Sequence, residues 1–173
     1  MNNQELDNIL DEPFTFRERP TPISPNLRPV RRIALLLLML DKCQGGKVSH
    51  EQLHVLNWAL RDTESQRALL EFLKGDSHPD KPIIRFDPTL DRATLFAEAE
   101  GFVAMELVGI KNGDRIDGQW PGYRVKLLDS GKQIVKELST MADCFKPERA
   151  FLSQLNGKFT QDKVKNLFNN ATL

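Results

Sequence analysis

The segment His50-Glu51-Gln52-Leu53-His54 is the part of the chain whose residue types and spacing most directly suggest chemistry. It has the H-E-x-x-H pattern of zinc peptidases, in which two histidines one helical turn apart ligate the metal and the glutamate acts as general base. The position of the pattern weakens this interpretation, because Ser49 and Gln52 have capping-box spacing and predict that it lies in the first turn of a helix. Glu51 is then explained by the helix dipole, which favours an acidic residue near the N-terminus.

A third zinc ligand is not marked by the sequence. No further histidine follows His54 at the spacing of the extended peptidase motif, and three glutamates are equal candidates: Glu64, Glu71 and Glu98. A zinc metalloprotease, with His50 and His54 as its metal candidates, is therefore a minor alternative. Otherwise we expect no metal and no cofactor.

Other catalytic motifs are absent from the sequence. It contains neither the G-x-x-x-x-G-K-[ST] phosphate loop nor the G-x-S-x-G nucleophile motif. Cys43 and Cys144 lie far apart, and neither has a histidine beside it that could activate a thiol. The sequence therefore predicts a protein that is not an enzyme.

Composition limits the class of protein further. The chain has 173 residues, with 24 basic and 24 acidic side chains, so its net charge of zero argues against general nucleic-acid binding. The longest apolar run, Ile33 to Leu40, is shorter than the roughly 18 residues that span a membrane. The N-terminus lacks the plan of a secretory signal. These features predict a cytoplasmic globular protein with one domain and an appendage.

Residues 1–28 are expected to form an extended arm rich in proline and arginine. Residues 1–12 carry a charge of −4, whereas residues 13–32 carry +4 and include five prolines, which favour extended backbone. The arm is either a frayed linker or a segment that docks on a partner, because aromatic and arginine side chains are favoured anchors. Its candidate partner-binding residues are Phe14, Phe16, Arg17 and Arg19.

Residues 29–142 are expected to form the folded domain. The apolar residues of 31–43 occur nearly all round a helix, which is typical of the central helix of a core. Helices are also predicted from Ser49, at 64–74, at 89–101 and at 132–141, and strands at Pro82–Pro88, 103–109 and 123–128. Three strands this short cannot form a sheet with its own core. They predict a mainly helical α+β fold, specifically a winged helix-turn-helix domain with a β-hairpin wing.

Residues 143–173 are expected to form a helical tail with two amphipathic segments, at 147–155 and 160–168. It has a large apolar set for its length: Phe151, Leu152, Leu155, Phe159, Val164, Leu167 and Phe168. The tail either packs back on the domain, which the sequence favours, or offers a dimer or partner surface.

The predicted helix before the wing is poorly suited to reading DNA. A helix that enters the major groove must offset phosphate charge, but residues 88–102 carry a net charge of −2. The wing is slightly basic and allows a backbone contact with DNA. A transcriptional regulator therefore remains the alternative to a protein-binding module, whose candidate wing residues are Arg115, Trp120 and Arg124.

Three segments of the domain resemble a known family. They are RPVRRIALLLLMLDKCQGGKVSHEQLHVLNWAL, IIRFDPTLDRATLFAEAEGFV and GYRVKLLDSGKQIVKEL, and together they cover about residues 28–140. The pattern resembles the middle component of ABC three-component systems, the small subunit of Lamassu-type bacterial defence complexes. This resemblance implies a non-catalytic adaptor subunit that bridges an SMC-like ABC-type ATPase and an effector, often a nuclease, in defence against phages and plasmids.

Overall fold

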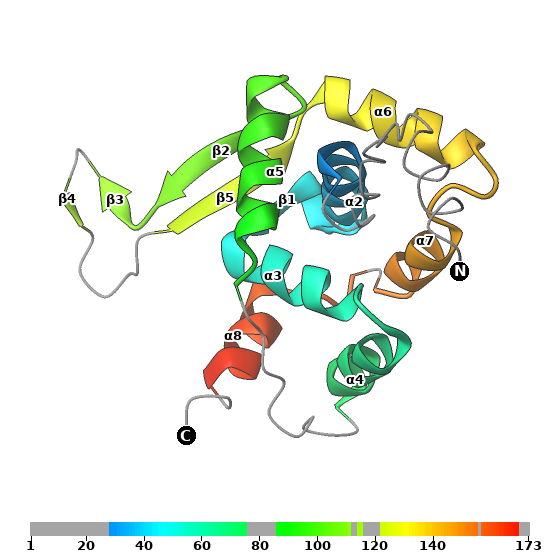
Figure 1. The fold of residues 1–173 in the computed structure, drawn as a ribbon. Coiled ribbons are helices and arrows are strands. Elements are labelled where there is room, and N and C mark those ends of the chain that lie inside the picture. Colours follow the sequence, from blue (N-terminus) through cyan, green and yellow to red (C-terminus); the bar gives the residue numbers. More distant parts are fainter. Residues whose placement is uncertain (1–27, 76–85, 112–113, 116–121, 156, 170–173) are drawn as a thin grey trace, which may run out of the picture.

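The computed structural model describes residues 28–75, 86–111, 114–115, 122–155 and 157–169. Over these ranges the chain is mainly helical with a small antiparallel sheet, so the predicted mainly helical α+β class is confirmed. Of the predicted N-terminal arm, only Arg28 lies within them. The elements in Figure 1 are α2 (Pro29–Lys42), η2 (Gln44–Gly46), β1 (Lys47–Ser49), α3 (His50–Ala59), α4 (Thr63–Lys74), α5 (Pro88–Ala99), β2 (Val103–Val108), β3 (Ile110–Lys111), β4 (Asp114–Arg115), β5 (Gly122–Leu127), α6 (Asp129–Thr140), α7 (Lys146–Ser153) and α8 (Gln161–Asn169).

Helix α2 lies at the centre of the molecule. It contacts α3, α5, α6 and α7, which surround it in Figure 1. Its consecutive residues from Leu36 to Leu40 are all at most 1% exposed. A helix buried on every side belongs to the core, as the sequence predicted. No helix within the described ranges is both long enough and apolar enough to cross a membrane.

Helix α3 begins where the capping box predicted. The Ser49 side chain accepts a hydrogen bond from the Gln52 backbone N–H, and the Gln52 side chain accepts one from the Ser49 backbone N–H. This reciprocal pair satisfies two amide groups that the first helical turn would otherwise leave without a partner. His50 and His54 consequently occupy the first and fifth positions of α3, on one face of the helix.

The sheet has the strand order β1-β5-β2, and both neighbouring pairs are antiparallel. Val125 of β5 is the central residue, paired with Val48 on one side and Met105 on the other. The β2–β5 hairpin was predicted and projects from the helical body towards the short pair β3 and β4 (Figure 1).

The predicted strand Pro82–Pro88 is wrong where the structure describes it. Residues 82–85 lie outside the described ranges, Phe86 and Asp87 are not in a strand, and Pro88 is the first residue of α5. The reason is that Asp87 caps this helix, with its side chain accepting a hydrogen bond from the Thr89 backbone N–H at 3.0 Å. The third strand is instead β1, whose three residues are too few to show a period in the sequence.

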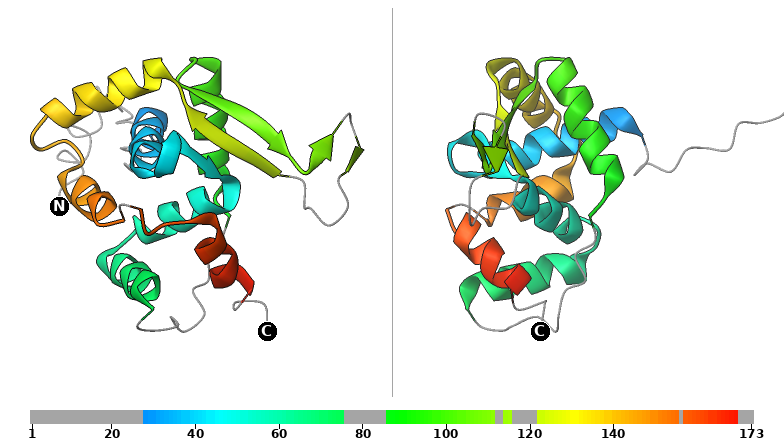
Figure 2. Two further views of the ribbon diagram at one scale, coloured as in Figure 1. Left: turned by 180° about the vertical axis from the view of Figure 1, so that it is seen from behind. Right: turned by 90° about the vertical axis from the view of Figure 1, so that its left-hand side faces the viewer.

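The C-terminal tail packs back on the core, as its apolar residues predicted. Figure 2 shows α7 and α8 alongside the rest of the helical body. The Lys163 ammonium of α8 also donates to the backbone carbonyl of Leu73, at the end of α4, at 2.9 Å. Six tail residues join the same buried cluster as α2: Phe151, Leu152, Leu155, Phe159, Val164 and Leu167.

Candidate functional site

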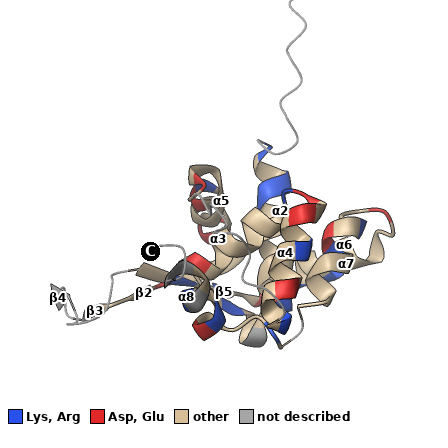
Figure 3. Cartoon of the chain, turned by 90° about the horizontal axis from the view of Figure 1, so that it is seen from below, with Lys and Arg blue, Asp and Glu red and all other residues tan. Residues whose placement is uncertain are grey.

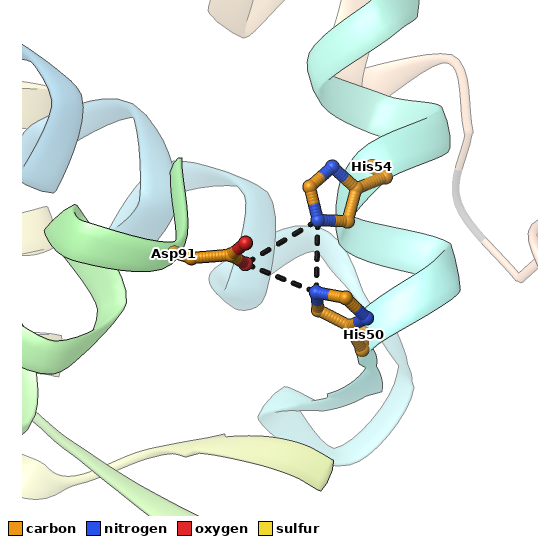
Figure 4. Close-up of side chains that lie close together, drawn as sticks. All are labelled: His50, His54 and Asp91. Carbon is orange, nitrogen blue, oxygen red and sulfur yellow. Dashed lines mark hydrogen bonds and ion pairs between the residues drawn. The ribbon is translucent and has the colours of Figure 1, made fainter. Parts of the chain in front are cut away.

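The two histidines of α3 meet one aspartate of α5 (Figure 4). His50 Nε2 lies 2.9 Å from His54 Nε2 and 3.0 Å from Asp91 Oδ1, and His54 Nε2 lies 3.4 Å from the same oxygen. Among the residues that the structure describes, these three form the one group of potential ligands that could hold a metal ion. We call them the His–His–Asp cluster.

Burial differs between the three side chains of the His–His–Asp cluster. The His54 side chain is fully buried, His50 is 22% exposed and Asp91 is 40% exposed. The cluster therefore has a closed side at His54 and an open side at Asp91. Burial, followed by the neighbouring His50, lowers the pKa of His54, which keeps its imidazole neutral.

Aromatic side chains surround the His–His–Asp cluster. The Tyr123 hydroxyl of β5 donates a hydrogen bond to Asp91 Oδ1 at 2.8 Å. Burial by itself would raise the pKa of Asp91, but the hydrogen bond from Tyr123 and the interaction with His50 outweigh it and hold the pKa below its usual value. The Phe86 ring lies 5.3 Å from the His50 ring and 4.6 Å from the His54 ring, measured between centroids. The cluster thus joins α3, α5 and β5.

The second nitrogen of His54 fixes its tautomer. The Asp87 backbone N–H donates to His54 Nδ1 at 3.2 Å, so this nitrogen is an acceptor. A neutral imidazole carries one proton, and in His54 that proton must then lie on Nε2, inside the cluster.

A second polar network lies beside the cluster and centres on Asp87. Its carboxylate accepts hydrogen bonds from Arg32 of α2 at 3.1 Å, Asn57 of α3 at 3.2 Å and the Thr89 hydroxyl at 2.7 Å. Burial alone would raise the pKa of Asp87, but the hydrogen bonds from Thr89 and the positive charge of Arg32 outweigh it and lower the pKa to about 2. The start of α5 is therefore held to both α2 and α3.

Sequence reasoning identified the two histidines but missed Asp91. The three glutamates considered as third ligands, Glu64, Glu71 and Glu98, do not belong to the cluster. Asp91 lies far from His54 in the chain, and no local pattern marks it. It reaches the histidines only because the first turn of α5 lies near the first turn of α3 in the fold. Two pockets lined by described residues lie away from the cluster, one beside α2 and α7 and the other beside β1 and the start of α8.

The predicted partner-binding residues are only partly visible. Phe14, Phe16, Arg17, Arg19 and Trp120 lie outside the described residues. Arg115 belongs to β4, and its side chain is outside the description. Arg124 of β5 is half-buried and donates to the Gln161 side chain of α8 at 3.1 Å.

The outward face of α5 carries large apolar side chains. The net charge of −2 calculated for residues 88–102 gave no indication of this. Leu95 and Phe96 are 56% and 55% exposed. Asp91, one of the acids in the net charge of −2, is directed to the histidine pair, and the Glu98 carboxylate accepts a hydrogen bond from the Met105 backbone N–H at 2.9 Å. In Figure 3 most of the ribbon is uncharged, with positive and negative residues interspersed.

No protein-family model, curated protein or solved structure matches this chain.

Proposed function

We propose that the chain is a non-catalytic binding subunit with a winged-helix plan. The order α2, β1, α3, α5, β2, hairpin, β5 supports this plan, in which helices precede a β-hairpin wing. Helix α4 is then an addition between the second helix and the helix that precedes the wing. The position of β1 beside β5 supports the same reading, because the first strand and the returning strand form one small sheet.

The observation that carries the proposal is the outward face of α5. In a DNA-reading winged helix, the helix before the wing offers positive charge to phosphates. The exposed residues of α5 include one base, Arg92, and one acid, Glu98, beside the two large apolar side chains of Leu95 and Phe96. Exposed aromatic and aliphatic side chains side by side are suited to desolvation against another polypeptide.

The proposed partner on this face is the SMC-like ABC-type ATPase that the family resemblance implies. The chain bridges this ATPase to a nuclease-type effector, and the candidate residues of the arm and of the wing are the proposed contacts for partners other than the one on α5. The chain itself supplies contacts and no chemistry, so its loss separates the two partners.

Co-purification tests the proposal. The double variant Leu95→Glu/Phe96→Glu places two carboxylates on the exposed face and should release the proposed ATPase partner while the circular dichroism spectrum stays unchanged. Met141→Glu is the matched control, because Met141 is 55% exposed and lies at the far end of α6. Retention of the ATPase by the double variant would contradict the proposal.

The alternative, a winged-helix transcriptional regulator, makes an opposite prediction. It requires tight, site-selective duplex binding that falls steeply with salt. If the chain is a binding subunit, titration of a fluorescent duplex at two ionic strengths should show weak, non-selective binding, and the double variant should bind equally weakly. Site-selective binding lost in the double variant would favour the regulator.

A further inference from the structure

We propose that the His–His–Asp cluster binds one zinc ion through His50 Nε2, His54 Nε2 and Asp91 Oδ1. The inference is independent of the proposed binding role. It concerns what holds α3 against α5.

The three ligand atoms converge on one point. Tetrahedral zinc with ligand bonds of about 2.0–2.1 Å keeps its ligand atoms about 3.3–3.4 Å apart. The observed separations are 2.9, 3.0 and 3.4 Å, so an ion needs the atoms to move apart by only a few tenths of an ångström. Two ligands come from α3 and the third from α5, and both helices contact the central helix α2.

No placement of the ring protons makes all three contacts between His50 Nε2, His54 Nε2 and Asp91 Oδ1 favourable. His54 Nε2 carries a proton, because the Asp87 N–H occupies its Nδ1. If His50 Nε2 accepts from His54, its lone pair lies 3.0 Å from the Asp91 carboxylate oxygen, another acceptor. If His50 Nε2 instead donates to Asp91, two N–H groups face each other at 2.9 Å. One contact is repulsive in either arrangement. A cation attracts all three atoms once the His54 proton has moved from Nε2 to Nδ1.

Zinc binding has one local consequence. When His54 Nε2 ligates the ion, the ring proton moves to Nδ1 and faces the Asp87 N–H. The 3.2 Å hydrogen bond between these atoms must then open, in exchange for the metal–ligand bonds. The Asp87 backbone amide therefore reports on binding inside the cluster, and an ion on the outer surface would leave it unchanged.

The donor set restricts the metal to a transition ion or zinc. Two imidazoles and one carboxylate suit zinc and also iron(II), whereas magnesium and calcium prefer oxygen ligands alone. Zinc is the proposed ion because it needs no redox partner and accepts four-coordinate geometry. The open side at Asp91 gives an ion access and leaves room for water as the fourth ligand. The Tyr123 hydroxyl orients the Asp91 carboxylate, as a hydrogen-bonded neighbour of a metal ligand commonly does.

Zinc titration of the full chain after chelation tests the site. Calorimetry should show one zinc ion per chain, and an excess of magnesium should not compete. Affinity should fall about 100-fold or more in His50→Ala and in Asp91→Asn, which keeps the shape of the side chain. Glu51→Gln is the matched control, because Glu51 belongs to the H-E-x-x-H pattern but not to the cluster.

Measurements on the unaltered chain keep the test decisive if a variant does not fold. Zinc should shift the Asp87 amide resonance, and cobalt(II) should give the visible absorption of a tetrahedral site. Absence of zinc binding would overturn the proposal. Binding that leaves the Asp87 amide unchanged, or that persists undiminished in folded variants, would also overturn it and identify an adventitious ion only.

Discussion

At the scale of single residues, Asp87 connects more of the chain than any sequence pattern suggested. Its carboxylate accepts from Arg32, Asn57 and Thr89, and its backbone N–H donates to His54. The sequence predicted a helix from residue 89 but placed Asp87 in a strand, and it did not indicate this convergence. The partners come from α2 and α3, and long-range contacts of this kind leave no periodic trace in a sequence.

Replacement of Asp87 should therefore be costly. We expect Asp87→Ala to lower the free energy of unfolding by about 3 kcal/mol, because it removes a helix cap and leaves the part-buried Arg32 without this carboxylate. Urea denaturation measures the loss. Asp62→Ala is the control, since Asp62 caps α4 at the surface, and it should cost about 1 kcal/mol. Equal losses in the two variants would show that the Asp87 network adds nothing beyond the cap.

At the scale of elements, the sequence predicted features that depend on neighbouring residues more reliably than it predicted which strands and helices meet. The Ser49–Gln52 capping box and the β2–β5 hairpin are present as predicted, because both depend on residues close in sequence. Strand β1 was missed and the strand at Pro82–Pro88 was wrong where it is described, because a short edge strand is defined by its partner β5. Asp91 was missed for the same reason: its role depends on the fold that brings the first turn of α5 near that of α3.

Gly131 marks a close approach between elements that the sequence did not indicate. A Cβ atom at this position in α6 would meet the backbone carbonyl of Phe102 and would lie 2.7 Å from Leu127 Cδ1. Gly131→Ala should therefore destabilise the chain by about 2 kcal/mol, although the same change at an open helical site stabilises a helix. Thermal and urea unfolding test this, with Lys132→Ala at an exposed neighbouring position as the near-neutral control. Stabilisation by Gly131→Ala would contradict the close approach.

At the scale of the whole molecule, one core serves the predicted domain and the tail alike. Helix α2 is central, and the buried residues of α7 and α8 belong to the same cluster. The outside carries two distinct features: the hairpin, which projects away from the helices, and the apolar face of α5. Charge alone predicted that α5 is unsuited to DNA, but the exposed Leu95 and Phe96 could not be foreseen, because the sequence does not say which face of α5 packs inward.

Hydroxyl-radical footprinting of the complex with the proposed ATPase partner tests most directly whether α5 is the face that binds protein. In the chain alone, Phe96 and Met141 are both more than half exposed and should both be oxidised. We predict that Phe96 becomes protected in the complex while Met141 remains reactive. Phe96 that stays fully reactive in the complex, or that a DNA duplex protects instead, would contradict the account.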